Sequence, residues 1–233
     1  MRALIRWGRS DAAVWLSHLD IQRAIQRALR RSGVSCAWSQ GFNPHVLLSF
    51  ASALPVGVAS RYEVMDITFA QAPETPAAQR EAFERIAAAL PPGFFALESR
   101  WVDDRFPSPM ALAWAEELFV EPASDAPAMV QACATLMAAA SLTATIRSKK
   151  GERRVDIRPL ILSLEPQASG IVMRLRHGSS GSVRFESVWS ALCGIAGVSP
   201  RPQGLVRTAL FDDAMLPLLQ TRPSDPAEAE AHA

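Results

Sequence analysis

Three arginines stand at helical spacing near the beginning of the chain. Arg23, Arg27 and Arg30 occupy positions i, i+4 and i+7, opposite the apolar residues of the helix that the sequence predicts there. Guanidinium groups at this spacing can bind successive phosphates of a nucleic acid or the carboxylates of an acidic partner. A solvated helix face, with each arginine pairing locally, explains the spacing equally well. The three arginines are therefore candidate binding residues, and both interpretations stay open.

A turn-rich loop follows at residues 39–44, with the sequence Ser-Gln-Gly-Phe-Asn-Pro, and His45 comes directly after it. Loops that contain residues of fixed backbone geometry often place polar groups at a ligand. Gln40, Gly41, Asn43 and His45 are candidate binding residues on this basis. The alternative is a hairpin in which glycine and proline only shape the chain.

Two of the four histidines lie in these segments. If the loop folds over the beginning of the helix, His18 and His45 form an acid/base pair for metal-independent cleavage of RNA, with nearby arginines stabilising the phosphorane. No spacing rule requires the two histidines to converge. His18 also has a simpler interpretation as a surface residue of the first helical turn. They are the only catalytic candidates, and the sequence does not decide whether the protein is an enzyme.

The positions of the cysteines and the lack of known motifs argue against a metal site, a radical SAM cluster, a nucleotide-binding loop and a hydrolase site. Cys36, Cys133 and Cys193 are far apart in apolar surroundings, which is typical of small core residues and not of a metal site. The chain has no Cys-x-x-x-Cys-x-x-Cys run, so it cannot by itself hold the cluster of a radical S-adenosylmethionine (SAM) enzyme. It also lacks the glycine-rich nucleotide-binding sequences and the Gly-x-Ser-x-Gly sequence of hydrolases. We expect neither a metal nor a cofactor in this chain.

Composition narrows the class of protein further. Of the 233 residues, 49% are apolar, which is too many for a disordered chain. No run approaches the roughly 18 apolar residues of a membrane span, and charges interrupt the first residues where a signal peptide would need an apolar stretch. We expect a soluble cytoplasmic protein with no membrane contact.

Charge is distributed unevenly, although the net charge is only +1. Residues 1–60 hold seven arginines against two aspartates, and residues 61–142 hold five arginines against twelve carboxylates. Residues 143–222 are basic again. An anionic partner is compatible with this pattern, but a net charge near zero gives no general attraction to nucleic acid.

The helix that carries the arginines has clear boundaries. Ser17 and Asp20 form a capping box at its beginning, and Gly33 provides a left-handed end. The apolar residues between them recur at helical spacing and make one buried stripe, namely Ile21, Ala24, Ile25, Ala28 and Leu29.

The remaining elements form two similar series. The first series has strands at 3–7, 46–50, 62–69 and 94–98 and helices at 17–33 and 76–90. Its order, βαββαβ, is that of a ferredoxin-like unit. The second series is fainter, with strands at 113–120, 142–147, 155–164, 171–176 and 205–211 and helices at 126–140 and 185–192.

We therefore expect an α+β protein of two tandem ferredoxin-like units, with antiparallel sheets and helices on one face. The expected division is a first unit at 1–103, a connector at 104–112, a second unit at 113–212 and a disordered tail at 213–233. The duplication is inferred from the order of elements, because no residue-level repeat is present.

The segments that carry the candidate site resemble a radical SAM-linked family of unknown function, DUF2344. The resemblance is dense over residues 1–70 and sparse as far as about residue 211. It rests on the 17–20 and 39–45 segments, Arg23, Ala28–Gly33, Leu54-Pro55-Val56-Gly57, Glu63 and Asp66, and more weakly on Asp156-Ile157-Arg158-Pro159 and Val206-Arg207-Thr208. One departure is that relatives continue with Pro-Lys after the histidine, whereas this chain has Val46 and Leu47.

The resemblance implies an accessory role, because family members are fused to, or encoded beside, a cobalamin-binding radical SAM protein. The cluster and the cobalamin are then expected only on that partner. Our leading hypothesis is an adaptor that docks this enzyme and presents its substrate, such as tRNA or rRNA, through the arginine helix and the loop. Arg158 joins the candidate binding residues because the family pattern includes it. The alternatives are a stand-alone RNA-binding module and the ribonuclease with His18 and His45.

Overall fold

The computed structural model describes residues 1–122, 126–148, 151–178 and 181–221, and it is a mixed α+β protein with mostly antiparallel sheet. The chain divides into two compact units. Of the described residues, unit 1 comprises Met1–Ala113 together with Phe211 to Thr221, and unit 2 comprises those within Trp114–Leu210. The chain thus leaves unit 1, forms unit 2 and returns to unit 1.

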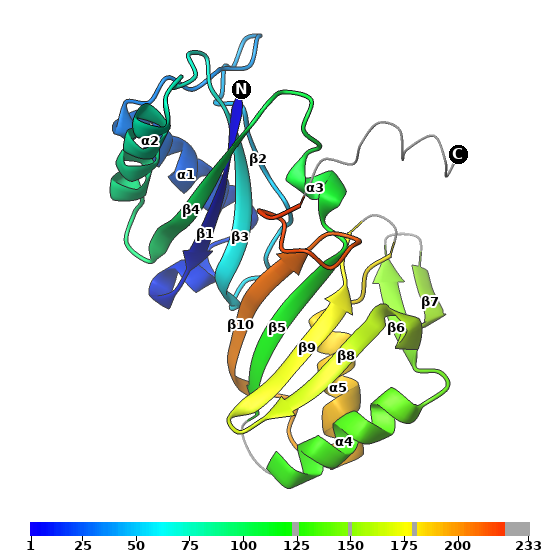
Figure 1. The fold of residues 1–233 in the computed structure, drawn as a ribbon. Helices are drawn as coiled ribbons and strands as arrows, with labels where there is room; N and C mark the ends of the chain where they lie inside the picture. The colour runs from blue at the N-terminus through cyan, green and yellow to red at the C-terminus, as the bar shows by residue number, and fades with distance from the viewer. Residues whose placement is uncertain (123–125, 149–150, 179–180, 222–233) are drawn as a thin grey trace, which may run out of the picture. The chain divides into compact units, whose positions relative to one another are not determined.

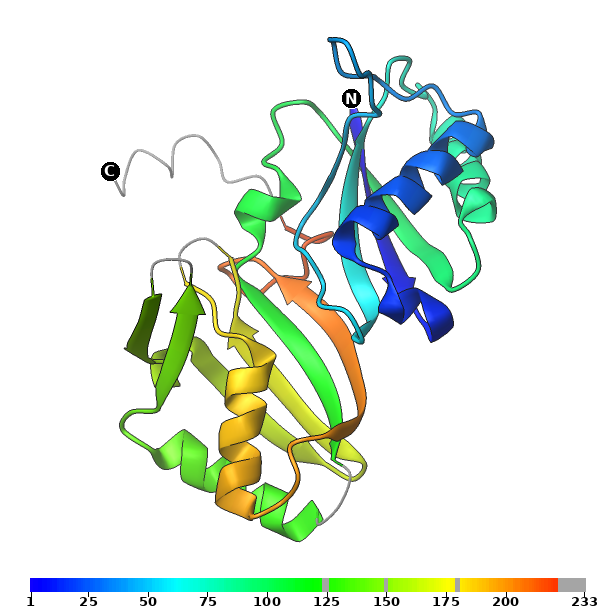
Figure 2. The ribbon, with the colours of Figure 1, turned by 180° about the vertical axis from the view of Figure 1, so that it is seen from behind.

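Unit 1 consists of a four-stranded sheet with two long helices on one face (Figures 1 and 2). Its elements are β1 (Arg2–Arg9), a short 3-10 helix (Asp11–Trp15), α1 (His18–Ser32), β2 (Leu48–Phe50), β3 (Ala59–Thr68), α2 (Pro76–Ala89), β4 (Phe94–Val102) and α3 (Pro109–Leu112). The strand order is β4-β1-β3-β2, and all three pairings are antiparallel. In the central pairing, Ile5 lies opposite Met65.

Helix α1 begins and ends as the sequence predicts. The Ser17 hydroxyl accepts a hydrogen bond from the Asp20 N–H and donates one to the Asp20 carboxylate, at 3.3 and 2.6 Å. Gly33 has a φ of 65°, in the left-handed region where glycine is favoured. The predicted apolar stripe is buried, together with Ser32. The caps therefore set the ends of the helix, and the buried stripe sets which side of it faces outward.

The core of unit 1 lies between the helices and one face of the sheet. Alternation along the strands puts Ile5, Trp7, Met65 and Ile67 on that face. They pack against apolar residues of α1 and α2, which include Ile21, Ile25, Leu29 and Ile86. Cys36 is one of the buried residues of this core, as expected for a small apolar side chain.

The other face of the unit 1 sheet is covered by two segments from outside the βαββαβ series. Arg100 of β4 donates to the Leu219 carbonyl at 3.1 Å, and its guanidinium lies 4.8 Å from the centre of the Phe106 ring. The Tyr62 hydroxyl accepts from the Leu219 N–H. Leu4 on this face is consequently 1% exposed. Residues 103–113 and 211–221 thus close the side of the sheet that the helices leave open.

Unit 2 also combines a four-stranded sheet with two helices. Its elements are β5 (Ala115–Pro122), α4 (Ala126–Ala138), β6 (Thr143–Ser148), β7 (Gly151–Asp156), a 3-10 helix (Arg158–Leu160), β8 (Ile161–Gln167), β9 (Gly170–Arg176), α5 (Phe185–Ala196) and β10 (Pro202–Phe211). The sheet order is β10-β5-β9-β8, while β6 and β7 pair only with each other. The hairpin is therefore an insertion between α4 and β8.

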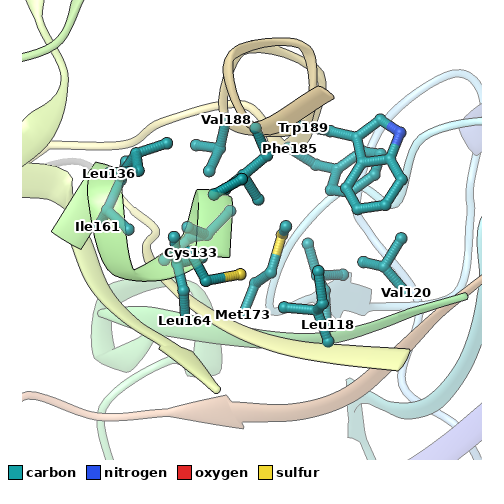
Figure 3. Packing of buried hydrophobic residues seen from close by; sticks show 14 of the residues in the cluster. Leu118, Val120, Cys133, Leu136, Ile161, Leu164, Met173, Phe185, Val188 and Trp189 are labelled. Carbon is teal, nitrogen blue, oxygen red and sulfur yellow. The ribbon is translucent and has the colours of Figure 1, made fainter. Parts of the chain in front are cut away.

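The core of unit 2 fills the space between its helices and one face of its sheet (Figure 3). Leu118 and Met173 come from the sheet, Cys133 from α4, and Val188 and Trp189 from α5. The opposite sheet face carries a polar network, in which Arg174 donates to Glu117 at 2.8 Å and to Glu165 at 2.9 Å. Thr208 also donates to Glu117, so the network spans all four strands.

Two predicted segments differ from the structure. The strand expected at 155–164 is interrupted by the 3-10 helix, where Pro159 cannot donate a ladder hydrogen bond. Residues 213–221, which we expected to begin a disordered tail, are packed: Pro217 forms a β-bridge with Phe211, and Thr221 donates to Asp212 at 2.6 Å. Residues 222–233 of the expected tail lie outside the described residues.

Candidate functional site

The arginine face of α1 is exposed in the structure. Arg23, Arg27 and Arg30 all point away from the buried stripe. Arg23 lies 3.8 Å from Asp20, and both side chains are more than half exposed, so this pair is weak. Among the described residues, neither Arg27 nor Arg30 forms an ion pair with a carboxylate. Their positive charge is therefore available to a ligand.

The 39–45 loop lies beside the C-terminal end of this helix. The guanidinium carbon of Arg30 is 5.0 Å from the centre of the Trp38 ring, which is the geometry of a cation–π interaction. Trp38 in turn forms an antiparallel β-bridge with Val46, so both ends of the loop are held together. The structure thus brings the predicted arginine face and the predicted loop together at Arg30.

Hydrogen bonds between Ser39 and His45 close the loop. The Ser39 N–H donates to the His45 carbonyl at 2.8 Å, and the His45 N–H donates to the Ser39 hydroxyl at 3.1 Å. Nδ1 of His45 lies 2.8 Å from the same hydroxyl and 3.4 Å from the Asn43 carbonyl. Gly41 has a φ of 127°, which favours glycine at this turn. The tip of the loop, residues 40–45, is exposed throughout.

The structure does not bring His18 and His45 together. His18 packs edge-on against Phe50, with the ring centres 5.4 Å apart, at the beginning of α1. His45 belongs to the loop beside Arg30, twelve residues further along the helix, which corresponds to about 18 Å at 1.5 Å per residue. Val46 pairs with Trp38, beside Arg30, whereas Phe50 lies beside His18, so in this structure the loop is not folded over the helix start. The geometry gives no support to an acid/base pair.

Arg158 belongs to unit 2, and its guanidinium is engaged by the backbone. It donates to the Met137 carbonyl at 2.6 Å and to the Ile161 carbonyl at 3.1 Å. Met137 lies in the last turn of α4, where carbonyls lack helical partners and favour a cation. Arg158 therefore has a structural role, unlike Arg27 and Arg30: two of its nitrogens tie α4 to the beginning of β8, while its buried Nε has no hydrogen-bond partner among the described residues.

Two further parts of the resemblance, Leu54–Gly57 and Asp66, are held in place by buried arginine contacts. Arg9 is fully buried and donates to the carbonyls of Val58, at 2.9 Å, and of Leu16 and Pro55. It thereby ties the Leu54–Gly57 segment to the turn before α1. Asp66 pairs with Arg2 at 2.7 Å; burial raises the pKa of Asp66, and Arg2 opposes that shift.

Sequence reasoning missed the two aromatic side chains of the site. Trp38 is 40% exposed and Phe42 is completely exposed. A large aromatic residue between Gly41 and Asn43, in an otherwise polar turn, is a signal that could have identified Phe42. For Trp38 the sequence holds no comparable signal, because its position beside Arg30 depends on tertiary packing.

Metal ligands do not gather among the residues that the structure describes. The three cysteines are buried and unpaired. Burial raises the pKa of the Cys36 and Cys133 thiols to about 11, which disfavours the thiolate form that binds metals.

Comparison with protein families identifies the family of this chain. A family model described as an uncharacterised protein conserved in bacteria, DUF2344, matches residues 2–185. The chain belongs to the DUF2344 family. The match includes α1, the 39–45 loop and most of unit 2. No curated protein matches this DUF2344 chain. In its described part, no helix combines the length and apolarity needed to cross a bilayer.

Proposed function

We propose that this DUF2344 protein is a non-catalytic accessory protein that binds a cobalamin-binding radical SAM enzyme and holds that enzyme's RNA substrate on unit 1. The family resemblance supports the choice of enzyme partner. The cluster and cobalamin would belong to the partner, since Cys36 lies in the core of unit 1 and the other two cysteines lie in the core of unit 2.

The observation that carries the RNA part of the proposal is the free positive charge on α1. Arg27 and Arg30 are exposed and have no carboxylate partner among the described residues, and Arg23 has only a weak one. Charge-assisted hydrogen bonds from guanidinium groups to phosphates are strong and geometrically specific. The other arginines of this region are engaged: Arg31 donates to the Ala89 carbonyl at 2.7 Å, and Arg85 donates to the Ser32 carbonyl at 2.9 Å.

The sheet faces of both units are poor surfaces for RNA, which favours the α1 helix and the loop. We infer a ferredoxin-like arrangement in each unit, supported by the orders β4-β1-β3-β2 and β10-β5-β9-β8, which are equivalent when the strands of each βαββαβ series are numbered in sequence. Ferredoxin-like RNA-binding domains commonly stack bases on aromatics of the open sheet face. In unit 1 that face is covered by residues 103–113 and 211–221, and in unit 2 it carries the Glu117–Arg174–Glu165 network. The exposed helix and loop are then the better surface for RNA.

The enzyme part is tested by co-purification. A cobalamin-binding radical SAM protein of the kind that family members are encoded beside, carrying an affinity tag, is expected to retain this chain at micromolar concentration. Failure to associate would overturn the adaptor role. If RNA binding persisted in that case, the protein would be the stand-alone RNA-binding module.

The RNA part is tested by the salt dependence of binding to a tRNA fragment. Replacing Arg27 and Arg30 with glutamine removes two phosphate contacts. The slope of log K against log salt is negative, and it should become less steep by about 1.4, at about 0.7 for each contact to single-stranded RNA. Arg80→Gln is the matched control, because Arg80 is an exposed arginine on the other helix of unit 1. Equal slopes for both variants and the wild type would contradict the proposed phosphate contacts.

A further inference from the structure

We infer that unit 1 recognises unpaired nucleotides, whose bases stack on Phe42 and Trp38 while the arginines of α1 hold the adjoining phosphates. This inference rests on the proposed function and specifies the class of RNA that the site takes. It is carried by two aromatic side chains of one loop: Trp38, which lies beside the Arg30 guanidinium, and Phe42, which is completely exposed at the loop tip.

Phe42 has no structural role that explains its position. It is completely exposed at the tip of a loop that is already closed by the hydrogen bonds between Ser39 and His45. An aromatic side chain left in water forgoes the free energy that burial would provide. The ring of Phe42 is therefore available to a flat partner such as a nucleobase.

Trp38 provides a second aromatic surface at the base of the same loop. It is 40% exposed, and Arg30 lies over its ring at 5.0 Å. Arginine next to an aromatic ring is a common combination in single-stranded nucleic-acid sites, since the ring stacks with a base and the cation binds the phosphate. The spacing of Arg30 and Arg27 along the helix, about 4.5 Å, extends this charge away from the loop.

The polar side chains of the loop favour nucleotides over lipid or an apolar protein groove. Gln40 and Asn43 lie on either side of Phe42, both are exposed, and neither side-chain amide hydrogen-bonds to another described residue. Each amide offers both a donor and an acceptor, which is what the edge of an unpaired base requires. Insertion of Phe42 into lipid would bury these amides without partners.

Duplex RNA does not fit the same arrangement. Stacked and paired bases present neither a free face to Phe42 nor a free edge to the amides. Recognition by this loop therefore requires a single-stranded segment, a bulge or a terminal loop.

The test compares Phe42→Ala with the wild type in binding to a 12-nucleotide single-stranded RNA and to a duplex of the same sequence. Because Phe42 is completely exposed, its replacement leaves the fold intact. Phe42→Ala should weaken single-strand binding roughly 5- to 100-fold and leave the salt slope unchanged. Trp15→Ala is the matched control, since Trp15 is 71% exposed at the opposite end of α1, and it should have little effect.

Three other results would each contradict either this inference or the proposed function. Equal affinity of the wild type for single strand and duplex, with no effect of Phe42→Ala, would overturn the inference and leave the phosphate contacts of the proposed function standing. An unchanged salt slope in the Arg27→Gln/Arg30→Gln variant would instead contradict the proposed function. Loss of binding to phosphatidylglycerol vesicles, but not to RNA, in Phe42→Ala would overturn the inference in favour of a membrane contact.

Discussion

The guanidinium of Arg207 makes two hydrogen bonds to the same carboxylate oxygen of Glu116, from Nε at 3.0 Å and from Nη2 at 2.7 Å. Both side chains are buried in unit 2. Two charges removed from water stabilise the fold only as long as each keeps its partner. The weak family motif Val206-Arg207-Thr208 thus corresponds to an ion pair inside the protein and not to a binding surface.

Removal of this carboxylate should destabilise the protein strongly. Glu116→Ala removes the carboxylate that the buried Arg207 guanidinium hydrogen-bonds twice, which is expected to cost about 3–5 kcal/mol in the free energy of unfolding. Urea denaturation followed by circular dichroism measures the change. The exposed Glu81 is the control, and Glu81→Ala should stay within about 0.5 kcal/mol of the wild type. A similar, small change for both variants would contradict the importance of the pair.

The same cluster predicts a loss of stability in acid. Nδ1 of His177 lies 3.9 Å from the Glu116 carboxylate. Burial lowers the pKa of His177 below the ordinary value of 6.5; the Glu116 charge opposes this shift and the Arg207 charge adds to it. A lowered folded-state pKa means that the unfolded chain binds the proton first. Stability should therefore decline as the pH falls through 6.5 and continue to decline until the folded-state pKa is passed. His177→Gln should flatten this part of the curve, and an unchanged curve would assign the acid sensitivity to other groups.

Arg158 should matter for stability and not for binding. Arg158→Ala removes the hydrogen bonds to the Met137 and Ile161 carbonyls, at a cost of roughly 1–3 kcal/mol. RNA affinity and its salt slope should stay at the wild-type values. A stable Arg158→Ala protein with weakened RNA binding would return Arg158 to the binding site.

The cap of α1 can be tested separately from the arginines. Ser17→Ala removes the acceptor for the Asp20 N–H and should lower the free energy of unfolding by about 1 kcal/mol. Ser17→Asn keeps an acceptor at the same position and should restore most of this loss. If both variants behave alike, Ser17 does not act through its side chain.

The cysteines should be unreactive in the folded protein. All three are buried, and the thiol pKa of about 11 at Cys36 and Cys133 leaves almost no thiolate near neutral pH. Ellman's reagent at pH 7.5 should label none of them rapidly before denaturation and all three afterwards. Fast labelling of the native protein would show that a core opens readily.

Local signals in the sequence were sufficient for α1 and its surroundings. Ser17, Asp20 and Gly33 act through hydrogen bonds and dihedral angles within a few residues, so the helix boundaries follow from residue types. The arginine face then follows from helical spacing. These are the parts of the site that a sequence can predict.

Long-range packing determined the rest. Trp38 is placed by a tertiary contact with Arg30, and residues 213–221 contact Arg100 and Tyr62, which are far away in the sequence. The assignment of Arg158 required knowing that the last turn of α4 lies beside it. Spacing along the chain contains no information on such partners.

The return of the chain to unit 1 after Leu210 has a consequence for biosynthesis. While the protein is being translated, Leu4 and the rest of its sheet face emerge well before residues 211–221 that shield them. This face, on which apolar Leu4 lies among charged side chains such as Arg100, stays without its cover during synthesis of about a hundred intervening residues. On a ribosome stalled before Phe211, the sheet face of unit 1 would lack the cover of residues 211–221. Binding of chaperones to the nascent chain is expected to be greatest at this stage.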